Sequence, residues 1–172
     1  MKKVITHIDC PKEWESENDY DSHRELLYLI LSNDKESHPV AEFGSGFGST
    51  FLLRDYCKEH NRGFESYETD EIWANTTGST LIESFKNKKL PMGYILFIDG
   101  KPGEERKNLI YNNKDKHIII VHDTELGAEY VYGMSEILST FKYRIDYQPK
   151  GKPHTTAVSN YINITDRKST RL

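Results

Sequence analysis

The chain has 172 residues, of which 23 are Lys or Arg and 27 are Asp or Glu, and its net charge at pH 7 is −4. This length suits one domain that can bury roughly 70% of its unfolded surface without a metal or disulfide, so Cys10 and Cys57 are expected to be reduced. An aromatic content of 12% argues against disorder, and the mild negative charge argues against a general nucleic-acid binder.

No stretch of the sequence has the features of a membrane or export segment. No run approaches the ~18 apolar residues that span a bilayer, and the N-terminus lacks the apolar core of a secretory signal. We therefore expect a cytoplasmic protein with no membrane partner and no nucleic-acid partner.

The first elements of the chain are an arm and a helix. Residues 1–21 are polar with little periodicity, which predicts an N-terminal arm, and Trp14 and His23 are candidates to line a substrate lid. A helix is predicted over 22–32, because apolar residues recur there at helical spacing. Its first residues, from Ser22 to Glu25, have the Ser-x-x-Glu form of a capping box.

A strand–loop–helix–strand unit follows. The strand over 39–43 runs directly into the glycine-rich segment 44–50, and a helical pattern then extends from about Ser49 to His60. Gly63 is expected to stop this helix in the left-handed conformation. The second strand covers 64–67.

Two continuous apolar runs, 94–98 and 117–121, are the strongest strand signals, because a strand covered on both faces needs apolar side chains throughout. A helix is predicted between them over 102–113. After Asp123, a stripe that includes Tyr130, Met134 and Ile137 predicts a further helix packed into the core. The stretch 71–93 is less regular, and its apolar segment 81–85 fits either a strand or a helix.

The last two strands are predicted over 142–147 and 155–164, and the turn between them is too short for a parallel crossover. Residues 165–172 are expected to be a frayed tail. Strands that alternate with helices indicate an α/β protein, a Rossmann-like three-layer sandwich with a mostly parallel central sheet and an antiparallel last strand. The domain is expected to cover 22–164.

The glycine-rich loop is the main indication of function. Ligands of open parallel sheets bind at the carboxyl ends of the strands, where glycine lets the backbone approach closely. The three alternate glycines that begin at Gly44 depart from the dinucleotide pattern, which needs glycine where Ser49 stands. Glu42, just upstream, would repel a diphosphate and attract a cationic ligand. Glu68, at the end of the second strand, is placed to hold ribose hydroxyls.

The segment that starts at Glu42 resembles motif I, Glu-x-Gly-x-Gly-x-Gly, of the class I S-adenosylmethionine-dependent methyltransferases. The likeness covers about 22–164. Small sugar and natural-product O-methyltransferases are more similar still. They share the Gly-Ser-Gly-x-Gly-Ser-Thr loop (44–50), an Asp-Gly-x-Pro-Gly segment (99–103) and a strand that ends in His-Asp. The chain departs from the family between Glu68 and Tyr94, where only 25 residues stand in place of a helix, a strand and a second helix, and the family's adenine contacts normally come from that third strand.

The resemblance implies S-adenosylmethionine as the cofactor. The residues that would bind it are Glu42, Gly44, Ser45, Gly46, Gly48, Ser49, Thr50, Glu68 and Asp99. The catalytic candidates at the strand ends are Asp99, His122 and Asp123, of which His122 titrates near neutrality if unperturbed. Asp99 and Asp123 are alternatively ligands of a divalent metal such as Mg that orients an acceptor diol. Lys101 and Arg106 are candidates to hold an acidic or phosphorylated substrate.

We therefore expect O-methylation of a sugar or another small hydroxylated molecule, in a pocket that a homodimer could complete. One alternative is a non-catalytic S-adenosylmethionine-binding interaction domain, which the short stretch 69–93 favours. Another is an NAD-dependent oxidoreductase, against which Glu42 and Ser49 argue. A purely structural alternative is that Asp99 and Asp123 only cap the helices that follow them and that His122 is a satisfied buried histidine.

Overall fold

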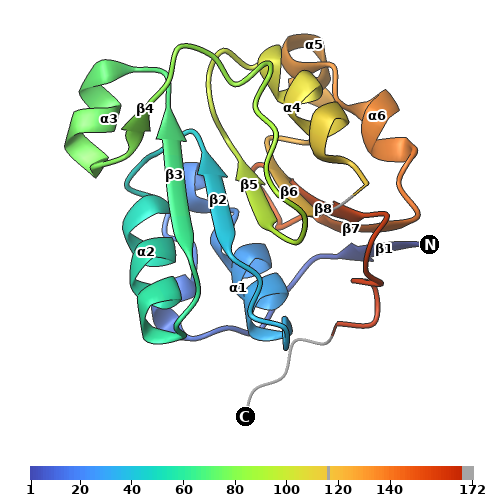
Figure 1. Ribbon diagram of the computed structural model, residues 1–172. Helices are drawn as coiled ribbons and strands as arrows, with labels where there is room; N and C mark the ends of the chain where they lie inside the picture. Colours follow the sequence, from blue (N-terminus) through green and yellow to red (C-terminus); the bar gives the residue numbers. More distant parts are fainter. Residues whose placement is uncertain (116, 168–172) are drawn as a thin grey trace.

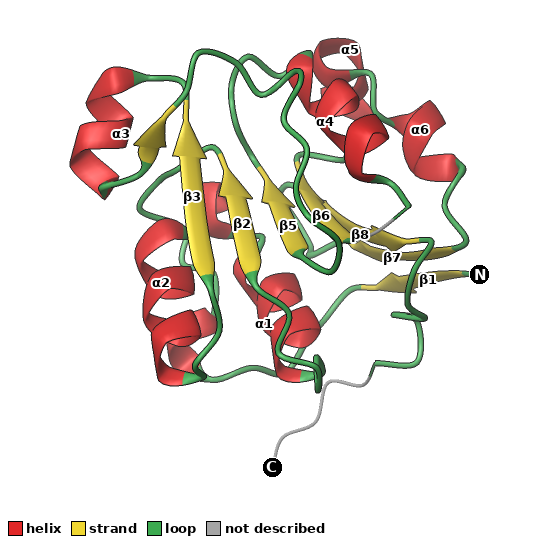
Figure 2. Ribbon diagram, in the orientation of Figure 1, coloured by secondary structure: helices red, strands yellow, loops and turns green. Residues whose placement is uncertain are grey.

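One mixed sheet of eight strands runs through the described part of the protein, and helices pack on both of its faces (Figures 1 and 2). The computed structural model describes residues 1–115 and 117–167. The strand order is β1-β7-β8-β6-β5-β2-β3-β4. The strands are β1 (Lys2–Ile5), β2 (Val40–Phe43), β3 (Phe64–Glu68), β4 (Thr80–Leu81), β5 (Ile95–Ile98), β6 (Ile118–His122), β7 (Tyr143–Tyr147) and β8 (Thr155–Ser159).

The sheet is parallel except at β8, which runs antiparallel to both β6 and β7. This confirms the predicted fold class. β7 and β8 are antiparallel because the connection between them is too short for a parallel crossover. β8 is shorter than predicted because the Ser159 hydroxyl accepts hydrogen bonds from the backbone N–H groups of Tyr161 and Ile162, at 3.0 and 2.9 Å. Those bonds turn the chain away from the sheet.

Helices on the two faces of the sheet enclose two apolar cores. On β5, Phe97 belongs to one core and Leu96 to the other, because successive side chains of a strand point to opposite faces. Helices α1 and α2 contribute to the first core, and α4 and α6 to the second. The helices are α1 (Arg24–Ser32), α2 (Thr50–Glu59), α3 (Glu71–Thr77), α4 (Glu105–Asn113), α5 (Glu129–Tyr132) and α6 (Ser135–Ser139), with 3-10 helices η1 (Lys12–Trp14), η2 (Asp19–Asp21) and η3 (Leu126–Ala128).

Residues 1–21 are not a free arm. β1 pairs in parallel with β7 at the edge of the sheet. Trp14 is buried in the first core, with its ring 5.6 Å from Tyr28 and 5.4 Å from Tyr56. The polar composition of residues 1–21 did not predict this packing. One edge strand and one buried aromatic side chain, Trp14, hold the segment on the domain.

The predicted capping box at Ser22 and Glu25 is wrong. The Ser22 hydroxyl lies against His122 and the carbonyl of Pro153, while the Glu25 carboxylate accepts hydrogen bonds from the backbone N–H and the hydroxyl of Ser16. A capping box does form just upstream, between Asn18 and Asp21 of the η2 turn. The side chains of Ser22 and Glu25 therefore bond to distant residues and not to the helix end that the local pattern predicted.

Three further local predictions need correction. Asn61, with φ of 52°, takes the left-handed position expected at Gly63. The helix predicted after Asp123 is broken at Gly133, whose φ is 58°, so Tyr130 is 96% exposed and lies outside the core. Met134 and Ile137 are buried as predicted.

The end of the described chain is packed against the domain. Thr165 and Arg167 are buried, and the Arg167 guanidinium donates to the carbonyl of Ile30. The rest of the predicted tail, 168–172, lies outside the described residues. None of the helices in 1–115 and 117–167 is long and apolar enough to cross a membrane.

Candidate cofactor and active site

A cavity of about 860 Å³ opens at the carboxyl ends of β2, β5 and β6. The glycine-rich loop from Gly44 to Ser49 and the residues that follow β5 and β6 line it. The N-terminal segment also reaches the cavity, because η2 packs on the loop and Arg24 donates from Nε to the carbonyl of Gly48 at 2.8 Å. The cavity is therefore at the position that open parallel sheets use for ligands.

Gly44 is needed for the geometry of this loop. Its φ is +94°, and a Cβ atom there would lie 2.2 Å from the Cα of Gly100. The loops after β2 and β5 therefore touch through glycine backbone alone. No larger residue fits at Gly44 without separating these two strand ends.

Glu42 organises the loop from inside the protein. It is completely buried, and its carboxylate accepts hydrogen bonds from the hydroxyls of Ser49, Thr50 (2.8 Å) and Ser66 (2.6 Å). Burial raises the pKa of Glu42 to about 7, although the three hydroxyls oppose this shift. Glu42 is not part of the cavity wall, so the geometry gives it a role in shaping the loop and not the expected direct contact with a cationic ligand.

Glu68 connects the same loop to the end of β3. Its Oε2 accepts from the backbone N–H of Ser45 at 2.8 Å, and its Oε1 accepts from the N–H groups of Thr69 and Asp70 at 2.7 and 3.0 Å. Glu68 is buried and lies outside the cavity wall. A ribose bound here would share these oxygens with the backbone.

The loops after β3 and β5 are in direct contact. The Thr69 hydroxyl donates to the carbonyl of Lys101 at 2.6 Å, which joins the loops after β3 and β5. Phe85 is fully buried and packs so tightly that a Cβ on Gly100 would lie 2.3 Å from its ring. Among the described residues, no helix lies between β4 and β5. The short segment that connects them contributes the buried ring of Phe85.

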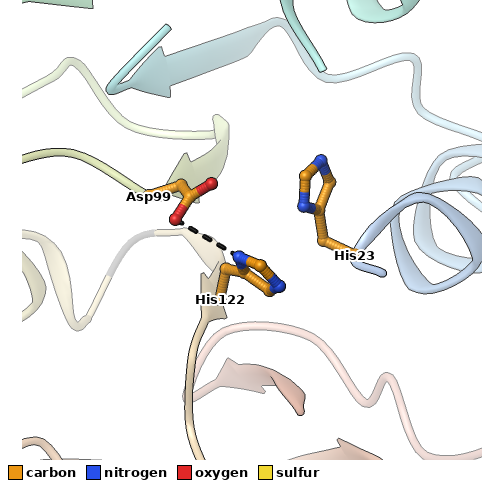
Figure 3. Close-up of side chains that lie close together, drawn as sticks. All are labelled: His23, Asp99 and His122. Atoms are coloured by element: carbon orange, nitrogen blue, oxygen red, sulfur yellow. Dashed lines mark hydrogen bonds and ion pairs between the residues drawn. The ribbon is translucent and has the colours of Figure 1, made fainter. Parts of the chain in front are cut away.

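Asp99, His122 and Asp123 do lie together, as predicted (Figure 3 draws the first two). His122 Nδ1 is 3.3 Å from Asp99 Oδ1 and 3.5 Å from Asp123 Oδ1. Burial alone would raise the pKa of Asp99 and lower that of His122. Their hydrogen bond and opposite charges outweigh burial, so the pKa of Asp99 falls and that of His122 rises. These shifts favour the charged forms of both groups.

Asp123 differs from Asp99 in backbone and in environment. Its φ is 57°, a left-handed conformation that is uncommon outside glycine and that Asp adopts more easily than most residues. Burial raises the pKa of its carboxyl. Its side chain is 23% exposed, and it lines the cavity.

Arg106 holds these strand ends together. Its guanidinium donates to the carbonyls of Gly100 (2.9 Å) and His122 (3.0 Å), lies 3.3 and 3.4 Å from the carboxylates of Asp99 and Asp123, and covers the ring of Tyr132 at 4.1 Å. Only 2% of the side chain is exposed. Arg106 also lines the cavity, and because most of its donors are used within the protein, its expected substrate-holding role stays a prediction. Lys101 is exposed at the cavity wall.

Ser22 fixes the orientation of His122. Its hydroxyl lies 3.0 Å from His122 Nε2, 3.0 Å from the Pro153 carbonyl and 3.2 Å from the Asp19 carbonyl. One hydroxyl proton goes to a carbonyl, so the oxygen accepts from His122 Nε2–H. Both ring nitrogens of His122 are therefore engaged, and Ser22, separated by 100 residues in sequence, could not be identified from any local motif.

His23 also reaches the cavity. It is 1% exposed, and its ring lies 4.7 Å from that of Phe97 and 4.8 Å from that of His122. Neither of its ring nitrogens has a hydrogen-bond partner among the described residues. Burial lowers the pKa of His23 to about 3, so the imidazole is neutral. Of the two predicted lid residues, only His23 lines the cavity.

An aromatic rim, formed by Phe47, Phe51 and Trp73, borders the cavity. Phe47 stacks on Phe51 at 6.3 Å and meets Trp73 edge-on at 5.3 Å. All three are exposed, and Phe47 and Trp73 also line the cavity. No local pattern predicts this rim, because its residues come from three separate segments: the glycine loop, α2 and α3.

Among solved structures, the chain is similar to several S-adenosylmethionine-dependent methyltransferases. The METTL16 MTase domain is 12% identical with a TM-score of 0.56, over 91% of this chain and 74% of that one. Precorrin-6y C5,15-methyltransferase from Geobacter metallireducens is 13% identical with a TM-score of 0.51, over 88% and 93%. M. capricolum TrmK, in complex with S-adenosylhomocysteine, is 14% identical with a TM-score of 0.50, over 86% and 70%.

At these identities the likeness shows the fold, which is the Rossmann-like fold of these methyltransferases. The chain spans only 40% of the length of a further match, the T. thermophilus 16S rRNA N2 G1207 methyltransferase RsmC. No protein-family model matches the sequence, and no curated protein does.

Proposed function

We propose that the protein is an S-adenosylmethionine-dependent methyltransferase that methylates a hydroxyl of a sugar or another small molecule. The observation that carries this proposal is the cavity, which lies at the carboxyl ends of β2, β5 and β6 and is walled by the Gly44–Ser49 loop and Asp99. The fold is the one seen in known methyltransferases. The substrates of those proteins are not carried over to this chain. The acceptor proposed here is argued only from the residues of this chain.

The cofactor is proposed to lie along the glycine loop. Its methionine end would contact the backbone of the loop next to Asp99, and its ribose would contact Glu68. Glu42 acts indirectly, through the hydroxyls of Ser49 and Thr50. The adenosyl group is proposed to enter where the loops after β3 and β5 meet, which would open the Thr69–Lys101 hydrogen bond.

Methyl transfer needs little covalent help from the protein. The acceptor oxygen attacks the sulfonium methyl in line, and holding the two partners at near-attack distance supplies much of the rate. The hydroxyl must lose its proton to a nearby base. We assign that role to Asp123, since its partly exposed carboxylate lines the cavity, whereas both ring nitrogens of His122 are engaged.

The charges around the cavity favour a small acceptor over a polyanion. Within the described residues, five carboxylates line it, against three Lys or Arg side chains and His122. A nucleic-acid backbone would meet this excess of negative charge, which electrostatics disfavours. Exposed Lys101 is the remaining candidate for holding a charged group of the acceptor.

Calorimetry with S-adenosylmethionine and S-adenosylhomocysteine tests the proposal, with NAD as the comparison. We expect both sulfur compounds to bind and NAD not to bind. A folded sample that binds neither sulfur compound would refute the proposal. Binding without methyl transfer to any acceptor in a panel of sugars and other hydroxylated compounds would favour the non-catalytic alternative.

The assignment of the base is tested separately. Asp123→Asn should lower kcat by about 10²- to 10⁴-fold, the usual contribution of general base catalysis, with little change in cofactor affinity. Asp55→Asn, at an exposed carboxylate of α2, is the matched control and should be as active as the wild type. A fully active Asp123→Asn variant would remove Asp123 from the mechanism.

A further inference from the structure

Two imidazoles and one carboxylate converge at the floor of the cavity. The side chains are His23, Asp99 and His122, and one candidate ligand atom from each lies within 4.8 Å of the others. His23 comes from the start of α1, while Asp99 and His122 come from the ends of β5 and β6. Figure 3 shows the His23 imidazole facing the Asp99–His122 pair across a small gap.

We propose that these three side chains bind one first-row divalent transition-metal ion. Two imidazole nitrogens with one carboxylate oxygen are donors that suit Zn²⁺, Fe²⁺, Co²⁺ or Ni²⁺ better than Mg²⁺ or Ca²⁺, which prefer oxygen. The site is therefore different from the Asp99–Asp123 magnesium pair predicted from the sequence. Ligand atoms about 2.1 Å from a tetrahedral ion are about 3.4 Å apart, so side-chain movements of roughly an ångström would close the site.

The condition of His23 points to a missing ligand. Buried polar groups are normally hydrogen-bonded, and a buried imidazole without a partner is costly. Both nitrogens of His23 are nonetheless unpartnered among the described residues, at 1% exposure, and the ring lines the cavity. A metal ion between His23 and the Asp99–His122 pair would satisfy one of these nitrogens.

The surroundings of His122 fit a metal ligand. A ligating histidine usually donates its second N–H to an oxygen, which fixes the tautomer and the ring orientation. Here the Ser22 hydroxyl accepts from Nε2 at 3.0 Å. Nδ1 is then the nitrogen on the side of Asp99, and an ion can replace the proton that it now shares with Asp99 Oδ1 at 3.3 Å.

Arg106 is the competing cation, and its position leaves room for an ion. Its guanidinium contacts Asp99 through Oδ1, as His122 does. The other carboxylate oxygen of Asp99, Oδ2, is therefore available to bind the ion. A quarter of the Asp99 side chain is exposed. The second carboxylate, Asp123, offsets the charge of Arg106. The open side of the ion would face the cavity and could hold an oxygen of a bound molecule.

Metal binding is measured on the full chain without cofactor, so its outcome does not depend on the methyltransferase proposal. Chelator-treated protein is dialysed against Zn²⁺, Co²⁺ or Mg²⁺, and the bound metal is counted by elemental analysis. We expect one equivalent of Zn²⁺ or Co²⁺, visible absorption bands from bound Co²⁺, and at least tenfold weaker binding of Mg²⁺.

His23→Phe is the decisive variant. Phenylalanine keeps the ring packing against Phe97 and removes two unpartnered nitrogens, so the variant should fold, as circular dichroism would verify, and lose at least tenfold in Zn²⁺ affinity. Asp99→Asn should weaken binding similarly, while His60→Phe, at an exposed position at the end of α2, should bind like the wild type. The proposal is overturned if the wild type binds no stoichiometric metal, or if folded His23→Phe and Asp99→Asn bind it undiminished.

Discussion

Glu42 makes the stability of the protein depend on pH in a direction opposite to that of most carboxylates. Its folded-state pKa is about 7, compared with 4.5 for the ordinary group, because burial disfavours the charged form. A carboxyl with a raised pKa contributes stability that is complete below its unfolded pKa and is lost as pH rises through its folded pKa. Stability should therefore fall between about pH 4.5 and pH 7.

The shift of the Glu42 pKa sets the size of this effect. Each pKa unit corresponds to 1.36 kcal/mol, so the Glu42 contribution should drop by about 2.5 kcal/mol between pH 5 and pH 8. Glu42→Gln removes the titration, and the hydroxyls of Ser49, Thr50 and Ser66 can rotate to bond with the amide. For a chain of this length, the Tm of the wild type should fall relative to the variant by roughly 5–10 °C over that range.

Thermal unfolding of both proteins at several pH values from 5 to 8 measures this difference. Glu59→Gln, at an exposed carboxylate near the end of α2, is the control and should parallel the wild type. If the Tm profiles of wild type and Glu42→Gln are parallel across this range, Glu42 is already charged at pH 5 and the burial argument is wrong.

Two other predictions concern the loops around the cavity. Gly44→Ala should lower the free energy of unfolding by more than about 2 kcal/mol, because the new Cβ meets the backbone of the loop after β5. Gly46→Ala, where a Cβ meets nothing within 4 Å, should cost little by comparison, and equal losses in urea titrations would refute the reasoning. Thr69→Val removes the hydrogen bond between the loops after β3 and β5. If cofactor binding must open that contact, the affinity for S-adenosylhomocysteine should rise about two- to fivefold, since an exposed hydrogen bond is worth roughly 0.5–1 kcal/mol. Calorimetry checks this against Thr76→Val, whose hydroxyl bonds only within α3; an unchanged or weaker affinity for Thr69→Val would show that the contact does not gate the site.

Patterns of short range predicted the elements that build the sheet. The apolar runs that became β5 and β6 had to be strands covered on both faces, and the strand–glycine loop–helix unit from β2 to α2 followed from sequence order alone. Prediction was weaker where a residue had a choice of partners. Ser22 has the local form of a helix cap, yet its hydroxyl lies against His122, because a buried site offered three polar partners that the helix end did not.

The sequence by itself determined that the chain forms a mostly parallel α/β sheet, that a glycine loop lies at its ligand-binding edge, and that Asp99, His122 and Asp123 lie at strand ends near that loop. These features depend on periodicity and chain order, which are local. Only the tertiary structure decided what each side chain does there. Arg106 donates to the ends of β5 and β6, Glu42 accepts from the loop hydroxyls inside the protein, and His23 lies beside Asp99 and His122. Such roles depend on contacts between segments up to a hundred residues apart, and burial sets their energies, which a linear pattern does not encode.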